Sequence, residues 1–201
     1  MPKPLLRGLL NAVIFIGILL ALWPLGQSVY AHWNQRQLKQ NWQQATKTKV
    51  AQEKPKSPKP KAKIARSPWP ETRLVIPDAG VDVIVLDGWD DKTLRRAPSH
   101  MSGSANPGQI GNCAIAGHRN VYGSHFYKVD TLLAYAPIEL QTPQGTFVYR
   151  VISVGAYSEN DMSVLQPSAD PKSPALLTLV TCTIPRTPHR VIVRAMLETS
   201  A

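Results

Sequence analysis

Three residues in the second half of the chain are of types that perform covalent peptide chemistry. Cys182 ends the apolar run 176–182, and His118 comes just after the apolar run 112–116. A cysteine thiolate is a nucleophile, and a nearby histidine can supply or take its proton. Arg190 opens a further apolar run, and its guanidinium can donate hydrogen bonds to a developing oxyanion. The set indicates nucleophilic cysteine catalysis.

Each of these residues also has a simpler interpretation. Cys182 could be buried or joined to Cys113 by a disulfide, and Arg190 could be an ordinary surface residue at a strand end. Cys113 lies inside an apolar run that indicates core, whereas Cys182 lies at the end of one, which favours a free and reactive Cys182. The remaining histidines stand in polar surroundings and are expected to be solvated: His32, His100, His125 and His189.

The elements that position these residues begin at Glu71, where short apolar runs alternate with turn signals. This pattern predicts many short strands that form a closed barrel or a sandwich. Only the range Ser124–Tyr135 is predicted as a short helix. The expected strands are Arg73–Ile76, Val81–Leu86, Asn112–Ala116, Ile138–Gln141, Thr146–Val154, Leu176–Thr181 and Val191–Met196.

The N-terminal part is organised differently. Residues 8–26 contain no charged side chain, and as a helix they would span roughly 28 Å, about one hydrocarbon core. The run is longer than the apolar part of a signal peptide and lacks small residues at a cleavage site, so an uncleaved transmembrane anchor is predicted rather than a signal peptide or a buried core helix. Residues 1–7 are expected in the cytoplasm, because residues 27–35 carry no Lys or Arg. The bulk of the chain is then outside the cytoplasm.

Residues 27–70 are interpreted as a stalk and linker. Residues 30–45 suit a helical stalk, whereas the Lys- and Pro-rich range 46–70 is expected to be extended and solvated. The chain of 201 residues has a net charge of +10. Residues 27–68 alone carry +9, and residues 69–201 carry −1. A nucleic-acid-binding domain would show its charge on the folded part, so no nucleic-acid partner is expected.

The chain from Arg73 to Ala195 resembles the sortases, membrane-anchored cysteine transpeptidases of bacterial envelopes. The resemblance is carried by five segments in family order after an N-terminal anchor. They are Leu-Val-Ile-Pro (74–77), Pro-Gly-Gln-Ile-Gly-Asn (107–112), Ala-Ile-Ala-Gly-His-Arg (114–119), Thr-Leu-Val-Thr-Cys (178–182) and Arg-Val-Ile-Val (190–193). The short loop between Cys182 and Arg190 and the Thr-Leu-Val-Thr-Cys strand look most like class D or class E sortases, or those of Gram-negative bacteria.

The resemblance implies a fold and a reaction. Residues 71–201 would form a mainly β catalytic domain, a closed eight-stranded barrel with short helices. His118, Cys182 and Arg190 would be catalytic, with Thr181 as a local support. Cys182 would attack the Thr carbonyl of a C-terminal LPxTG-like sorting motif, and an amine of the envelope, such as a peptidoglycan precursor, would resolve the thioester and anchor the surface protein.

Residues 159–174 occupy the place where sortases shape the substrate groove. The groove candidates are Glu159, Asp161, Val164 and Leu165. Residues 99–111 contain no acid, so the calcium site of some sortases is not expected, and neither a metal nor a cofactor is predicted. Two alternatives stay open: a sortase-fold hydrolase that releases proteins, and a non-catalytic envelope-binding module whose cysteine and histidine are structural.

Overall fold

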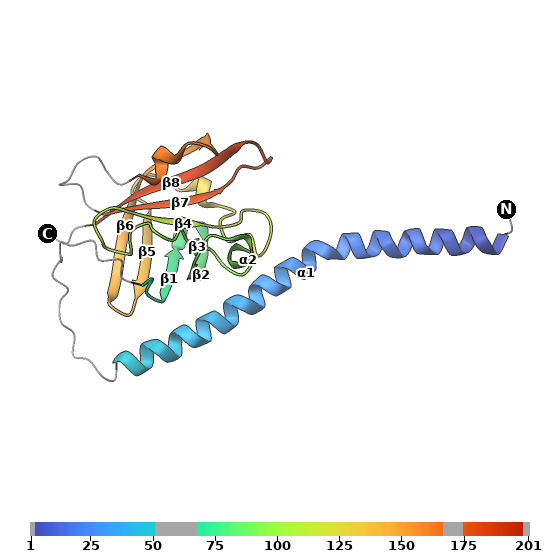
Figure 1. Ribbon diagram of the computed structural model, residues 1–201, viewed down its shortest axis with the longest axis horizontal. Helices are drawn as coiled ribbons and strands as arrows, with labels where there is room; N and C mark the ends of the chain where they lie inside the picture. Colours follow the sequence, from blue (N-terminus) through green and yellow to red (C-terminus); the bar gives the residue numbers. More distant parts are fainter. Residues whose placement is uncertain (1–2, 51–67, 167–174, 199–201) are drawn as a thin grey trace.

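The computed structural model describes residues 3–50, 68–166 and 175–198. One long helix, α1, precedes a β-domain (Figure 1). The elements in chain order are α1 (Lys3–Val50), β1 (Thr72–Ile76), η1 (Pro77–Ala79), β2 (Val81–Asp87), α2 (Asp91–Leu94), β3 (Ser99–His100), β4 (Asn112–Ala116), η2 (Val129–Thr131), β5 (Pro137–Thr142), β6 (Gly145–Ser158), η3 (Met162–Leu165), β7 (Leu176–Cys182) and β8 (His189–Leu197).

The eight strands form a closed barrel, which is one of the two architectures that the strand pattern predicts and the one that the resemblance implies. Their order around the barrel is β1-β2-β3-β4-β7-β8-β6-β5, and β5 pairs back onto β1. Neighbours are antiparallel except for β2 with β3 and β4 with β7, which run parallel. The parallel pair β4–β7 is central to the site, because it brings the ends of two strands to the same rim of the barrel.

Alternation of inward and outward residues builds the core. In β5 every second residue is buried, including Ile138 and Leu140, and Leu74 and Ile76 of β1 fill the same interior. Cys113 is 1% exposed, and burial raises the pKa of its thiol well above the ordinary value. Both cysteines are free, so the alternative disulfide between Cys113 and Cys182 is absent.

The structure corrects the expected local elements in three places. Of the predicted helix Ser124–Tyr135 only the 3₁₀ turn η2 forms. The N–H groups of Tyr127 and Thr131 bond three residues back in separate turns, and Ser124 and Tyr135 have positive φ angles of 50° and 67°, which a right-handed helix excludes. The two-residue strand β3 and the single turn α2 were not expected. Helix α1 continues through Val50, so residues 46–50 are helical rather than extended, and residues 51–67 of the linker lie outside the described part.

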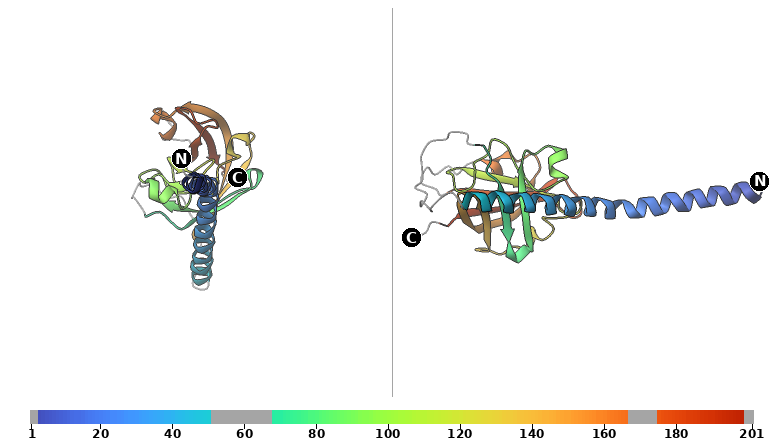
Figure 2. Two further views of the ribbon diagram at one scale, coloured as in Figure 1. Left: turned by 90° about the vertical axis from the view of Figure 1, so that its right-hand side faces the viewer. Right: turned by 90° about the horizontal axis from the view of Figure 1, so that it is seen from below.

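Helix α1 has two halves with different surroundings. The first half leaves the barrel, and the second half runs along its side (Figures 1 and 2). The apolar part of the first half is long enough to cross a membrane, and none of it is buried in the protein. The direction of the helix changes between the halves, which we attribute to Pro24 within it.

The second half of α1 docks on the barrel through polar groups. The Gln35 amide donates to the carbonyl of Ile84 at 3.1 Å and accepts from its N–H at 2.9 Å. Gln35 thereby satisfies both backbone groups of a β2 residue that the two-residue strand β3 does not reach. Lys39 adds an ion pair to Asp82 at 2.8 Å, and Ala31 is fully buried at the contact.

Candidate active site

Cys182 and Arg190 face each other across two antiparallel strands. Cys182 is the last residue of β7 and is half-buried, and Arg190 is the second residue of β8. Their Cα atoms are register partners. Directly opposed residues of an antiparallel pair place their side chains on the same face of the sheet. The short turn between β7 and β8 therefore returns a guanidinium to the face that carries the thiol.

His118 reaches the same rim through the parallel pair β4–β7. Ala116 is the register partner of Val180, and the N–H of Gly117 donates to the carbonyl of Val180 at 3.0 Å. His118 and Cys182 each lie two residues beyond this registered pair. The topology thus brings both residues to the ends of adjacent strands, as the sequence predicts.

The His118 ring is half-buried and unusually placed for a surface histidine. It lies 5.1 Å from the Tyr122 ring, measured between centroids. Its Nε2 is buried and has no hydrogen-bond partner within the described ranges. Burial lowers the pKa of His118 below its ordinary value, with Arg95 lowering it further and Asp91 opposing. A neutral imidazole with a free ring nitrogen is suited to accept a proton at neutral pH.

Thr181 joins the two strands next to these residues. Its hydroxyl is buried and donates to the carbonyl of Gly117 at 2.7 Å. This bond links the residue before Cys182 to the residue before His118. The supporting role that the resemblance implies for Thr181 stays a prediction.

Arg119 is the functional candidate that sequence reasoning missed. It is 8% exposed, and its guanidinium donates to the carbonyl of Cys182 at 3.3 Å and to the carbonyl of Tyr127 at 3.4 Å. The same guanidinium forms an ion pair with Asp130. Arg119 therefore fixes the backbone of Cys182 to the loop that follows His118. The sequence carries no signal for its burial, because the groups that bind its guanidinium lie elsewhere in the chain.

Comparison with known proteins agrees with this arrangement. The sortase domain family matches residues 74–198. The chain belongs to the sortase family. Sortase SrtE1 of Streptomyces coelicolor is 30% identical over 122 residues, which are 55% of this chain and 35% of that protein, so the chain spans about a third of the length of this curated relative.

Solved sortase structures share the fold. A sortase D5 transpeptidase of Clostridium perfringens superposes with a TM-score of 0.63 and 25% identity, over 86% of this chain and all of that one. Sortase E1 of Streptomyces coelicolor with a tripeptide in the active site gives a TM-score of 0.59 and 31% identity, over 67% of this chain and 92% of that one. Family and fold together support a cysteine transpeptidase.

The four predicted groove residues of this sortase have different surroundings. Glu159 forms an ion pair with Arg190 at 2.7 Å, and the Arg190 guanidinium also donates to the carbonyl of His189 at 3.0 Å. Asp161 accepts from the N–H and hydroxyl of Ser163 and so begins η3. Glu159 is thus the one of the four that contacts a proposed catalytic side chain.

The other two groove candidates lie in η3. Val164 is 6% exposed, and its carbonyl accepts from Asn112 at 3.1 Å and Thr178 at 3.4 Å. It anchors η3 on the strands β4 and β7, so its side chain does not offer a surface to a substrate. Leu165 is half-buried. Residues 167–174 of the predicted groove segment lie outside the described part.

Proposed function

We propose that Cys182, His118 and Arg190 are the catalytic residues of a transpeptidase that cleaves an LPxTG-like sorting motif after Thr. The observation that carries the proposal is the strand register, in which Arg190 opposes Cys182 and His118 follows the end of the parallel neighbour β4. This register supports the proposal because it brings a thiol, an imidazole and a guanidinium to one rim of the barrel. No backbone rearrangement is needed to bring the three strand ends together.

The reaction proceeds in two halves. In the first, His118 takes the thiol proton as the Cys182 sulfur attacks the Thr carbonyl, and Arg190 stabilises the oxyanion of the tetrahedral intermediate. The C–N bond then breaks, His118 returns the proton to the leaving amine, and a thioester remains on Cys182. In the second half an envelope amine, such as that of a peptidoglycan precursor, loses a proton to His118 and attacks the thioester. A new amide forms and the thiol is restored.

The nucleophile that attacks this thioester determines whether the bound protein is anchored or released. Attack by an amine transfers the protein to the envelope, whereas attack by water hydrolyses it. Both outcomes use the same residues, so they differ in which nucleophile reaches the thioester. We propose amine transfer as the principal reaction, since family and fold support a transpeptidase.

The proposal includes the cell membrane as the site of action. Residues 8–26 would cross the membrane once, with residues 1–7 in the cytoplasm and the barrel outside. Exposed aromatic residues at Trp23, Tyr30 and Trp33 of α1 suit a membrane–water interface. The partners are then surface proteins that carry a C-terminal sorting motif.

Intact mass spectrometry of the full chain in detergent tests the catalytic assignment. The protein is mixed with a pool of peptides that carry varied LPxTG-like motifs, with and without an added amine. We expect a thioester adduct of the N-terminal peptide fragment, which the amine converts to an amide product. The adduct disappears in Cys182→Ala and persists in Cys113→Ala, the matched control in the barrel core.

Two results would contradict the assignment. An adduct that persists in Cys182→Ala would place the nucleophile elsewhere. A folded protein that forms no adduct and cleaves no peptide across the pool would favour the non-catalytic binding module. Hydrolysis that continues unchanged in the presence of amine would favour the hydrolase.

A further inference from the structure

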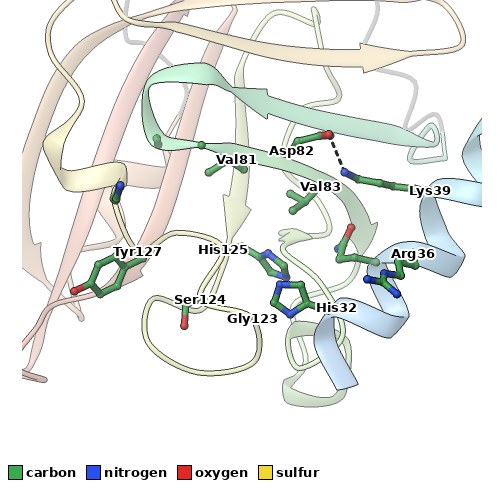
Figure 3. Close-up of a pocket in the computed structure, with 14 residues that line it drawn as sticks. His32, Arg36, Lys39, Val81, Asp82, Val83, Gly123, Ser124, His125 and Tyr127 are labelled. Carbon is green, nitrogen blue, oxygen red and sulfur yellow. Dashed lines mark ion pairs between the residues drawn. The ribbon is translucent and has the colours of Figure 1, made fainter. Parts of the chain in front are cut away.

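A cleft of about 520 Å³ lies between α1 and the barrel. Three separate segments line it: the docked half of α1, the turn between β1 and β2, and the loop that follows His118 (Figure 3). None of Cys182, His118 and Arg190 is among its lining residues. The cleft is therefore distinct from the catalytic rim, although one loop contributes to both.

The cleft has an excess of positive charge. Arg36, Lys39 and Lys128 line it, and Asp82 is the one carboxylate among its lining residues. Asp82 is already shared, because Arg73 holds it at 2.7 Å and Lys39 at 2.8 Å. Within the described ranges no carboxylate pairs with Arg36 or Lys128, and both side chains belong to exposed residues. An anion in the cleft would compensate these charges.

Two histidines face each other inside the cleft (Figure 3). His32 donates its Nδ1 hydrogen to the carbonyl of Ser28 at 2.7 Å, because a carbonyl can only accept. The Nε2 of His125 is buried and has no hydrogen-bond partner within the described ranges. Burial, and then the interactions with His32, His118 and Lys39, lower the pKa of His125 to about 4. An anion in the cleft would offset the positive field at this ring.

The backbone around the His125 ring is fitted closely. Gly123 has a φ of +86°, and a Cβ there would lie 2.8 Å from the Nε2 of His125 and 3.0 Å from the Cβ of Ala31. The loop can therefore approach α1 this closely only with glycine at this position. Helix α1 and the loop after His118 thus pack tightly together and form one wall of the cleft.

The position of the cleft along α1 can be compared with the position of the membrane. This comparison rests on the membrane anchor of the proposed function. His32 follows the last residue of the apolar span, Gly26, by six positions, or about 9 Å of helix. The headgroup layer of one leaflet is about 5–8 Å thick. The exposed aromatic residues Tyr30 and Trp33 flank His32, so the end of the cleft nearest the membrane lies at the outer edge of the headgroup layer.

We propose that the cleft binds the phosphate of an anionic membrane lipid. Arg36 and Lys128 supply the charge, and α1 and the loop after His118, which pack closely at Gly123, supply the walls. The bound headgroup would fix the barrel against the membrane through a loop that also carries Arg119. The catalytic rim would then keep one orientation relative to the bilayer.

Native mass spectrometry of the full chain in a neutral detergent tests this proposal. Phosphatidylglycerol, phosphatidylcholine and inorganic phosphate are titrated separately, and phosphate is also tested as a competitor. We expect phosphatidylglycerol to bind more tightly than phosphatidylcholine. Arg36→Gln/Lys128→Gln should weaken phosphatidylglycerol binding by about thirtyfold, since each basic residue near a lipid surface contributes on the order of a fivefold gain. Both substituted side chains are solvent-facing, so the fold is expected to persist.

The matched control is Lys92→Gln/Arg150→Gln, which removes the same charge outside the cleft and should leave lipid binding unchanged. Equal binding by wild type and Arg36→Gln/Lys128→Gln would overturn the proposal, as would equal binding of the two lipids. If inorganic phosphate displaces phosphatidylglycerol completely, the lipid proposal is wrong and the ligand is a free phosphate.

A parallel measurement separates this inference from the proposed function. Cys182→Ala should bind phosphatidylglycerol as wild type does, although it forms no thioester. Lipid binding without a thioester in wild type would refute the catalytic assignment alone. Thioester formation without selective lipid binding would refute the lipid site alone.

Discussion

Removal of the Asp130 carboxylate is expected to destabilise this sortase and slow its reaction together. Asp130 is the ionic partner of Arg119, whose other donors reach the carbonyls of Tyr127 and Cys182. In Asp130→Ala the guanidinium keeps its charge but loses its counter-ion at a side-chain exposure of 9%. A hydrogen bond to a charged group contributes about 1.5–3 kcal/mol. Asp130 itself is 34% exposed, which puts the expected loss near 2 kcal/mol.

The loss has two measurable consequences. A change of about 2 kcal/mol lowers the melting temperature of a domain of this size by about 4–8 °C. The Cys182 carbonyl also loses the fixed position of its donor, and small misplacements of a reacting group cost up to about a hundredfold in rate. We therefore expect kcat for a sorting-motif peptide to fall by about tenfold to a hundredfold. Differential scanning fluorimetry and a quenched-fluorescence peptide assay measure the two effects.

The chain offers a matched control for this substitution. Arg150 and Glu198 form an ion pair at 2.9 Å with side-chain exposures of 40% and 49%. Exposed pairs contribute about 0.2–1 kcal/mol, so Glu198→Ala should change the melting temperature and kcat little. If Asp130→Ala melts and turns over like Glu198→Ala, the argument that Arg119 fixes the nucleophile is refuted.

Two further predictions concern charge at other positions. Arg190→Gln should lower kcat about 100- to 1,000-fold, because it removes an oxyanion donor. Glu159→Gln keeps the guanidinium and should lower kcat less than about tenfold. Equal losses of kcat in steady-state peptide cleavage would contradict the role of Arg190. The folded-state pKa of His125 is about 4 against an ordinary 6.5, so the unfolded chain binds the proton first and stability falls as the pH drops from about 6.5 to 4. Urea unfolding should show that His125→Gln removes about 1–3 kcal/mol of this pH dependence, and an unchanged slope would refute it.

The barrel was predictable because its strands carry strong local signals. Apolar runs between turn residues located seven of the eight strands within a few positions. The strand β3 escaped because two residues, Ser99 and His100, are too few to show any alternation. The predicted helix from Ser124 failed for the opposite reason: its apolar spacing suits a helix, and only the backbone angles of Ser124 and Tyr135 reveal the loop.

The docked half of α1 shows a different limit of sequence reasoning. Its contact with the barrel uses Gln35 and Lys39 rather than an apolar stripe, so the hydrophobic pattern gave only loose support for a helix there. Polar side chains that bond to a distant strand leave no periodic trace in the sequence. The range 46–50 was assigned to the solvated linker because it opens the Lys- and Pro-rich part of the sequence.

The burial of two histidines could not be predicted from the sequence. His100 stands among polar residues, yet it is 3% exposed, stacks on Trp69 with ring centroids 4.0 Å apart and bonds to Asp87 at 2.8 Å. His125 is likewise enclosed, by α1 and by its own loop. The expectation that both are solvated is wrong, because the groups that cover them come from segments far away in the chain.

The catalytic candidates were accessible to sequence reasoning because each lies at the end of a strong strand signal, whereas Arg119 was not because its partners are set by three-dimensional folding. An arginine directly after the proposed base would by itself suggest a solvated side chain. The structure buries it because Asp130 supplies the opposite charge and two carbonyls each accept one further hydrogen bond. A single guanidinium thereby couples the backbone of Cys182 to the loop that forms one wall of the cationic cleft. Positional control of the nucleophile and contact with the membrane would then depend on the same loop.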